Sequence, residues 1–298
     1  MTIEIRSIQT HDEYLAVEQI QREVWGNDDV MIVPDHLLIT AQKNGGLLLG
    51  AFQVLPGTGR EQLVGFVFGF VGLAPSTGSG QAPSTGSGQA PDGKLKHCSH
   101  MAGVLPAHQN QNVGYHLKLA QREHVLAQGL DLVTWTFDPL ESRNARLNFH
   151  KLGATCRTYL RNLYGDMRDE LNAGLPSDRF QVDWYIASAH VAERLCGDYS
   201  GLPLSVLQAE GVPILNRFLP GDLPRPPQTV LPIEGDRLLV QIPAHSQAIK
   251  AADLGLALAW REHTRALFEA VFAAGYTVVD LLFDNERACY LLEKDWTP

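Results

Sequence analysis

The chain is poor in paired cysteines, in charged residues and in long apolar runs, and each shortage excludes a class of protein. Its four cysteines, at positions 98, 156, 196 and 289, are far apart and form no CxxC pair. This spacing argues against a disulfide framework and indicates reduced thiols. Charged residues make up 19% of the 298 residues, and the formal net charge is −9. The acidic balance disfavours non-specific nucleic-acid binding, and no Lys/Arg cluster reverses it locally.

The apolar segments of the sequence argue against a membrane protein. The longest apolar run, residues 63–74, is interrupted by Gly65, Gly69 and Gly72 and is too short to span a bilayer. The N-terminal residues MTIEIRSIQT lack the basic start and apolar core of a signal peptide. We therefore expect a cytoplasmic protein that binds neither membranes nor nucleic acid. With 45% hydrophobic residues, the chain has the composition of an ordinary globular protein.

Hydrophobic periodicity predicts a mixed α/β chain in the first 187 residues. The strand–helix–strand run between residues 96 and 137 implies a parallel pair of strands joined by a right-handed crossover. In chain order, we predict a strand at 2–8, helices at 11–25 and 34–43, strands at 47–55, 62–73 and 96–105, a helix at 113–128, a strand at 130–137, a helix at 142–152, and strands at 154–164 and 180–187.

Two segments interrupt this pattern. The octapeptide APSTGSGQ occurs twice in tandem and has no apolar anchor, so residues 75–93 are predicted to form a disordered hairpin loop. The proline-rich stretch 219–232 reads as a linker or crossover. After it come a strand at 237–242, a helix at 254–274 and strands at 276–283 and 289–292. We interpret this β-α-β-β order as an incomplete second copy and predict two domains, 1–187 and 188–298.

The stretch VLPAHQNQNVGY, residues 104–115, joins a predicted strand to a predicted helix through small polar residues and a glycine. The first N–H groups of a helix have no helical acceptor, and the helix dipole adds partial positive charge there. A pyrophosphate fits such a group of amides without a lysine. Asn112 is suited to the left-handed backbone that the turn needs. Taken alone, the pattern is also typical of a polar turn that merely starts a helix.

This turn resembles that of the GNAT family of acyl-CoA-dependent N-acyltransferases, as does the order of the predicted elements. In that family a strand ending V-x-P is followed by Q/R-x-x-G-x-G/A at the start of a helix. Gln109 matches the Q/R and Gly114 matches the second glycine, whereas Asn112 stands where the first glycine is usual. The departure leaves open whether the Asn112 side chain crowds a pyrophosphate or hydrogen-bonds to it.

A second patch, WTFDPLESRNARLNFHKLGA at 135–154, resembles the fifth strand and following helix of GNAT proteins. Ala145 and Gly153 match in spacing, and Ser142 stands at a position that is usually asparagine. Phe149 stands where the family often has a tyrosine that protonates the departing thiolate, so that role does not carry over. The segment DPLESRNA is also similar to a little-characterised branch of predicted acetyltransferases, for which amino-acid acceptors and succinyl-CoA as donor are implied.

The resemblance implies an α/β fold with a mixed, centrally splayed sheet flanked by helices. It also implies an acyl-CoA donor, acetyl-CoA or another such as succinyl-CoA, and transfer of the acyl group to a small amine, an amino acid being the first choice. A non-catalytic acyl-CoA-binding or regulatory protein, and a different α/β enzyme with another phosphate ligand, stay open, and a homodimer is one option for assembly. The residues expected to bind the donor are Ala102, Gly103, Val104, Gln109, Asn110, Gln111, Asn112, Val113, Gly114, Tyr115, Ser142 and Asn144.

Acyl transfer to an amine needs a base for the amine and an acid for the thiolate. His100, before the V-x-P, and Glu141, just after the fifth predicted strand, are the candidate bases, and Tyr164 is the candidate acid. Each has an alternative: His100 as an ordinary strand residue, Glu141 as a helix cap and Tyr164 as a packed aromatic. His97 and His100 are three apart on a strand and face opposite sides, so we predict no metal site.

Overall fold

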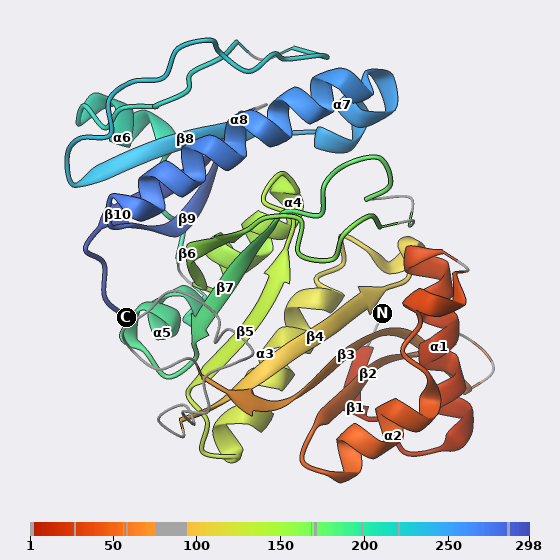
Figure 1. Cartoon of the computed structure of the whole chain (residues 1–298). Helices are drawn as coiled ribbons and strands as arrows, with labels where there is room; N and C mark the ends of the chain where they lie inside the picture. The colour runs from red at the N-terminus through yellow and green to blue at the C-terminus, as the bar shows by residue number, and fades with distance from the viewer. Residues whose placement is uncertain are drawn as a thin grey trace, which may run out of the picture. The chain divides into compact units, whose positions relative to one another are not determined.

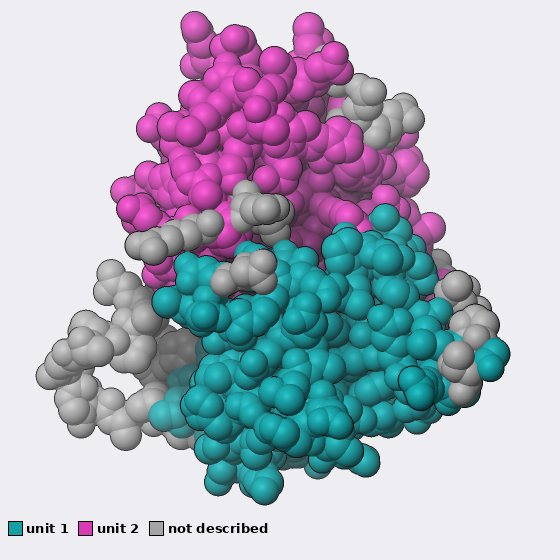
Figure 2. Space-filling view, turned by 90° about the vertical axis from the view of Figure 1, so that its right-hand side faces the viewer, with its two compact units in different colours: residues 1–135 teal, residues 136–298 magenta. Residues whose placement is uncertain are grey.

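The computed structural model describes residues 3–26, 28–55, 57, 59–74, 94–167, 169, 172–197, 199–219, 221–284 and 287–298. The low-complexity segment 75–93, predicted to be a disordered loop, lies outside these ranges. The chain divides into two compact units, residues 1–135 and 136–298, coloured teal and magenta in Figure 2. The boundary falls inside strand β5, and the domain boundary predicted near residue 187 lies within the second unit.

The first unit contains a sheet with the strand order β1-β2-β3-β4-β5 (Figure 1). Strands β1 to β4 pair antiparallel, and β4 pairs parallel with β5, as predicted. Helices α1 and α2 cover one face and α3 the other. The elements are β1 (Ile3–Ser7), α1 (His11–Trp25), the 3-10 turn η1 (Asp29–Met31), α2 (Asp35–Lys43), β2 (Leu47–Val54), β3 (Glu61–Leu73), β4 (Leu95–Val104), the 3-10 turn η2 (Pro106–His108), α3 (Val113–Ala127) and the start of β5 (Leu132–Phe137).

Local sequence signals explain where helix α1 begins and ends. The Thr10 side chain accepts from the Glu13 N–H while Glu13 reaches back to the N-cap backbone, which is a capping box. Tyr14, Val17 and Ile20 lie on one stripe and are buried against the sheet. The helix stops at Gly26, whose φ of 100° a residue with a side chain rarely adopts.

The second unit has the strand order β7-β6-β9-β10-β8 after the end of β5. Helix α8 lies over one face of these strands, and α6 lies on the other (Figure 1). The elements are α4 (Ser142–Ala145), the π-helical turn η3 (Arg146–Lys151), β6 (Thr155–Leu160), β7 (Arg179–Tyr185), α5 (Ala189–Leu195), α6 (Leu204–Ala209), β8 (Arg237–Pro243), α7 (Ser246–Ala252), α8 (Leu254–Ala273), β9 (Tyr276–Asp284) and β10 (Arg287–Lys294).

Two successive segments of the chain build this unit in the same order. After β5, a helical stretch (α4 and η3) leads to the antiparallel hairpin β6–β7, and after β8 the helices α7 and α8 lead to the antiparallel hairpin β9–β10. Strand β10 inserts between β9 and β8. The two hairpins meet where Cys156 of β6 pairs antiparallel with Val278 of β9. By topology, α8 therefore corresponds to the helical stretch after β5.

The predicted mixed α/β architecture is confirmed, including the β-α-β-β order of the last 62 residues from β8 onward. The sequence missed α6 and α7, which are only 6 and 7 residues long. It also extended β6 too far, because Asn162 has a φ of 40° and turns the chain away from the strand direction. Within the described ranges, no helix combines the length and the apolar character needed to cross a membrane.

Candidate functional site

The turn between β4 and α3 has the left-handed backbone that its asparagines favour. Asn110 has a φ of 65°, and Asn112, at the N-cap of α3, has a φ of 60° and a ψ of 14°. The first helical hydrogen bond of α3 runs from the His116 N–H to the Asn112 carbonyl, 3.0 Å away. Asparagine enters this backbone region more easily than other residues with a side chain, so Asn112 sustains the turn without a glycine. Left-handed residues in a turn are typical of anion-binding amide nests.

The turn presents several unpaired main-chain amides. The Gln109 N–H is not one of them, because it donates to the Pro106 carbonyl over 3.3 Å. The Gln109 side chain donates to the Val104 carbonyl over 3.2 Å and so braces the end of β4. Among the residues that the structure describes, no acceptor is found for the N–H groups of Asn110, Gln111, Val113 and Gly114. Four donors of this kind at a helix start attract an anion.

Strands β4 and β5 separate shortly before the turn. Their parallel pairing covers only His97 with Val133 and Cys98 with Thr134 in the described chain, although β4 continues to Val104. On its other edge, β4 stays paired with β3 through Val104. The register slips next to His100, which leaves this residue in a β-bulge. Among the described residues, the main chain after His100 thus has one edge without a strand partner, next to the residues Ala102, Gly103 and Val104 that were expected to bind the donor.

The predicted donor-binding residue Gly103 and the candidate base His100, both on β4, differ in their surroundings. Gly103 is covered by Trp25, the last residue of α1: a Cβ at Gly103 would lie 3.0 Å from a ring carbon of Trp25 and 3.1 Å from one of Phe66. His100 is exposed, and its ring contacts Phe68 and Phe70 with centroids 5.9 and 6.0 Å apart. Gly103 therefore permits a close approach of α1 to β4, and the His100 imidazole stays accessible.

Lys118 is a buried lysine that contacts Ser99 of β4 and Trp135 of β5, just after the last paired residues of these two strands. Lys118 of α3 donates to the Ser99 hydroxyl over 2.8 Å and to the Gln121 Oε1 over 3.1 Å. Its ammonium also lies 4.0 Å from the centre of the Trp135 ring. Lys118 has no carboxylate partner among the described residues, and burial lowers its pKa to about 7.

His97 belongs to the same buried cluster. Its Nε2 lies 3.1 Å from the Gln121 Nε2, and its Nδ1 has no hydrogen-bond partner in the described part of the chain. Burial, with the nearby Lys118 charge and His124, lowers the His97 pKa to about 4, so the ring is neutral near pH 7. His97 thus faces the α3 side while His100 packs against Phe68 and Phe70. Within the described ranges, no group of three or more His, Cys, Asp or Glu side chains could hold a metal ion.

The sequence did not single out Lys118, although a signal was present. The buried face of α3 consists of Val113, Leu117, Lys118, Gln121 and Val125. Two of these five positions are polar, which is unusual for a helix stripe that packs on a sheet. Polar residues at core positions of an amphipathic helix therefore indicated a buried polar cluster.

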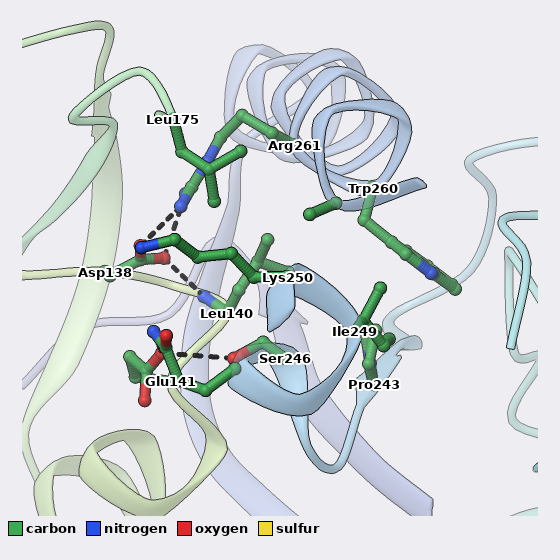
Figure 3. Close-up of a pocket in the computed structure, with 12 residues that line it drawn as sticks. Asp138, Leu140, Glu141, Leu175, Pro243, Ser246, Ile249, Lys250, Trp260 and Arg261 are labelled. Atoms are coloured by element: carbon green, nitrogen blue, oxygen red, sulfur yellow. Dashed lines mark hydrogen bonds and ion pairs between the residues drawn. The ribbon is translucent and has the colours of Figure 1, made fainter. Parts of the chain in front are cut away.

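In the second unit, Glu141 lines a small cavity of about 10 Å³, room for a single water molecule (Figure 3). Glu141 is the N-cap residue of α4, but its side chain does not cap that helix. Its carboxylate instead accepts from the Ser246 hydroxyl over 3.1 Å and from the Gln247 side-chain amide over 2.6 Å, both on α7. Glu141 therefore fastens α7 to the end of β5.

Asp138, which also lines this cavity, forms an ion pair through two nitrogens of Arg261 of α8 (Figure 3). One Arg261 nitrogen lies 2.9 Å from the carboxylate, and the Arg261 side chain is 1% exposed. Burial opposes the charge of Arg261, but Asp138 outweighs it and holds the Arg261 pKa above its ordinary value. The Asp138 carboxylate also accepts from the Leu140 N–H over 2.8 Å. This ion pair joins α8 to the residues that follow β5.

The structure gives different surroundings to the other predicted residues of this unit. Tyr164 is 54% exposed, and its hydroxyl lies 2.7 Å from the Thr136 hydroxyl on β5. The Ser142 hydroxyl is buried and donates to the Ala244 carbonyl over 2.8 Å, whereas Asn144 is exposed. Phe149 is fully buried and packs against Phe137, Phe180 and Tyr290. A hydroxyl at the Phe149 position would thus lie in an aromatic core.

No protein-family model matches the chain, and no curated protein is significantly similar to it. Solved structures do match. The ribosomal-protein-S18-alanine N-acetyltransferase from Escherichia coli is 16% identical, with 63% of this chain and 96% of that chain covered and a TM-score of 0.43. Arabidopsis thaliana NAA60 in complex with acetyl-CoA is 16% identical, with coverages of 62% and 99% and a TM-score of 0.44. An N-acetyltransferase from Staphylococcus aureus is 13% identical, with coverages of 62% and 99% and a TM-score of 0.43.

Proposed function

We propose that the chain is an acyl-CoA-dependent N-acyltransferase. The observation that supports this most strongly is the turn at 109–115, where the amides of Asn110, Gln111, Val113 and Gly114 lack acceptors in the described chain. A pyrophosphate is the part of coenzyme A that such amides would bind. The open edge of β4 leads directly into this turn, so an extended pantetheine arm would continue from it along the strand.

The open edge of β4 also suits the chemistry of the thioester. Strand main chain without a partner offers N–H groups, which can stabilise the negative charge that develops on a carbonyl oxygen during acyl transfer. Each such donor contributes about 3–4 kcal/mol of transition-state stabilisation in other acyl-transfer enzymes. No particular side chain is required for this step, which accords with Gly103 and Ala102 standing at this edge.

Proton transfer needs two further groups, and His100 and Tyr164 are our candidates for them, each judged from its own surroundings. His100 lies exposed in the β4 bulge, whereas the Glu141 carboxylate is already held by two hydrogen bonds in a small cavity. We assign His100 as the base that accepts the amine proton. Tyr164 is exposed beside Thr136 of β5 and is assigned as the acid that protonates the leaving thiolate. Glu141 then has the structural role of fastening α7.

The finer features of the activity are part of the same proposal. The acceptor is a small amine, with an amino acid as first choice, and the donor is acetyl-CoA or another acyl-CoA such as succinyl-CoA. The protein works in the cytoplasm without a metal, and a homodimer is one option for its assembly. The alternative is a protein that binds acyl-CoA without turning it over. Phenylalanine at position 149 favours that alternative, because the position that usually supplies the acid carries no hydroxyl and is buried.

Calorimetric titration with coenzyme A and a thiol-release assay test this proposal together. Gly114→Val should keep the helix, because valine is a better helix former than glycine. The bulk that it adds beside the Val113 and Gly114 amides should weaken coenzyme A binding at least tenfold. Val125→Ile, at the far end of the buried face of α3, is the matched control and should leave binding unchanged.

Thiol release from acetyl-CoA and succinyl-CoA, measured against a panel of amino acids, then separates enzyme from binding protein. Tyr164→Phe should lower the rate about 100-fold or more without affecting coenzyme A affinity, since a positioned acid contributes about that much. Binding of coenzyme A without release from any pair would support the non-catalytic alternative. Absence of coenzyme A binding would refute both.

A further inference from the structure

The second unit contains a larger cavity, of about 590 Å³, that the proposed acyl transfer does not use. It lies between α5, the stretch 199–202, strands β9 and β10, and the C-terminal segment around Trp296. Figure 1 shows the C-terminus beside α5. Cavities of 300–1,000 Å³ are of the size that holds a small organic ligand.

Asp280 lies at the floor of the cavity with its charge compensated. Its carboxylate accepts from Arg194 over 2.8 Å, from the Tyr199 hydroxyl over 2.9 Å and from the Leu281 N–H over 2.7 Å, and the His150 Nδ1 lies 3.1 Å away. Burial opposes ionisation, but His150, Arg194 and Tyr199 together keep the pKa of Asp280 below its usual value. The Asp280 and Arg194 charges at the floor therefore neutralise each other, and neither is available to pair with a ligand.

The wall formed by residues 199–202 is fixed against this floor. The Tyr199 ring lies over the Arg194 guanidinium, 3.9 Å from its centre, while the hydroxyl reaches Asp280. Gly201 has a φ of 69°, and a Cβ there would lie 2.8 Å from a ring carbon of His150. Only glycine lets the chain pass so close to the floor, so this wall of the cavity is built into the fold.

Among the described residues that line the cavity, two charges remain without a partner, and both are negative. Glu193 of α5 and Glu293 of β10 line it, and neither carboxylate has an ion-pair or hydrogen-bond partner among the described residues. Since Asp280 and Arg194 cancel, the lining carries a net charge of −2 from these two glutamates. His190 does not change this balance, because burial lowers its pKa. Its buried Nε2 lacks a hydrogen-bond partner in the described chain.

Apart from Cys196, Ser200 and Gly201, the rest of the lining is apolar and aromatic. Leu202, Leu282 and Leu291 contribute aliphatic surface, and Trp296 contributes an indole ring that packs edge-on against His190 with centroids 5.4 Å apart. Carboxylates next to an aromatic ring are the surroundings in which proteins bind ammonium groups, through ion pairing and cation–π attraction. An anionic ligand would be repelled by the two carboxylates, whereas a cation would gain an ion pair with each.

The geometry points to a binding site for a small organic ammonium ion in this cavity, with the cationic group toward Glu193 and Glu293 and the hydrocarbon part against Trp296 and the leucines. The site is independent of the turn at 109–115, and the inference does not depend on the proposed acyl transfer. It assigns a ligand class to the C-terminal part of the chain, for which no role could be predicted from residue patterns.

Calorimetric titration of the full chain with choline and with putrescine, at constant ionic strength, tests the inference. We expect at least one of these cations to bind and sodium succinate not to bind. Glu293→Gln and Glu193→Gln should each weaken cation binding about tenfold, the effect of losing one charge-assisted contact of ~1.4 kcal/mol. Glu262→Gln, an exposed glutamate of α8 away from the cavity, is the matched control and should leave affinity unchanged.

Trp296→Leu provides a second variant that keeps both carboxylates, and it should weaken choline binding more than putrescine binding. Urea unfolding of every variant verifies that the fold is retained. The inference is overturned if neither cation binds, if Glu262→Gln affects binding as much as Glu293→Gln, or if succinate binds as well as the cations do. Gly114→Val should leave choline binding intact, whereas loss of binding in that variant would place the cation elsewhere and also overturn the site.

Discussion

Replacing Lys118 with methionine should stabilise the chain near neutral pH, although it removes two hydrogen bonds. Lys118 is buried, and the groups around its ammonium are the Ser99 hydroxyl, the Gln121 amide oxygen and the Trp135 ring. None of these carries a negative charge. Methionine has a similar length and places an apolar thioether in the same space, where it needs no partner.

The magnitude follows from the pKa of the buried amine. Burial lowers the Lys118 pKa from 10.5 to about 7, which corresponds to a cost of ~5 kcal/mol for holding the ammonium in this position. Losing the two hydrogen bonds of Lys118 costs about 1–3 kcal/mol and offsets part of this gain. The cost is limited because Ser99 and Gln121 keep the 3.1 Å hydrogen bond between them. We therefore expect Lys118→Met to raise the free energy of unfolding by ~2–4 kcal/mol at pH 6.5.

The pH dependence is the sharper signature. The folded-state pKa of Lys118 lies below the unfolded value, so below pH 7 both states carry the proton and the cost is constant. Between pH 7 and about 10.5 the unfolded state keeps the proton that the folded state has released, so this amine makes the natural chain more stable by up to ~1.4 kcal/mol per pH unit. Methionine lacks this contribution. The advantage of the variant should therefore shrink as the pH rises.

Urea unfolding, followed by tryptophan fluorescence at several pH values from 6.5 to 9.5, measures this difference. From pH 7.5 to 9.5 the advantage of Lys118→Met should fall by ~2–3 kcal/mol. Lys43→Met, which replaces an exposed lysine of α2, is the control and should show no such fall. A difference that stays constant with pH, or a Lys118→Met protein less stable at every pH, would refute the account of this cluster.

Three further substitutions test other parts of the structure, each by its unfolding midpoint in urea. Phe149→Tyr should lose ~1–3 kcal/mol and gain no thiol-release activity, because its hydroxyl would enter an aromatic core; higher activity would restore the usual acid role to this position. Gly103→Val should lose at least ~1–3 kcal/mol by displacing Trp25, and unchanged stability would contradict that close contact. Asp138→Asn should lose ~3–5 kcal/mol by leaving Arg261 buried without its counter-charge, and a loss under ~1 kcal/mol would mean that solvent reaches the pair.

The order of the elements could be predicted because it rests on local periodicity. The strands and helices of the first 187 residues have strong alternating or helical patterns, and the parallel pair β4–β5 follows from the strand–helix–strand run alone. The left-handed backbone at Asn112 was also predictable from its residue type. Short helices such as α7, with 7 residues, are stabilised by tertiary contacts and leave a weaker pattern.

The site was less predictable, because its properties depend on partners distant in sequence. Glu141 is engaged by residues more than 100 positions later in the chain, which no local pattern reveals. The same holds for the compensation of Asp280 by Arg194, 86 residues away. The engagement of the Gln109 amide by Pro106 arises from a 3-10 turn that the sequence did not indicate. Residue types therefore suggested candidates, and the three-dimensional contacts show which candidate groups are already engaged by other residues.

The most direct test of the anion-binding turn is a titration of the isotope-labelled chain with coenzyme A, followed by the amide resonances of Asn110, Gln111, Val113 and Gly114. Pantetheine, which lacks the pyrophosphate, serves as the control ligand. If the turn binds the pyrophosphate, these four amides shift with coenzyme A and not with pantetheine. Coenzyme A binding that leaves the four resonances in place would contradict the account.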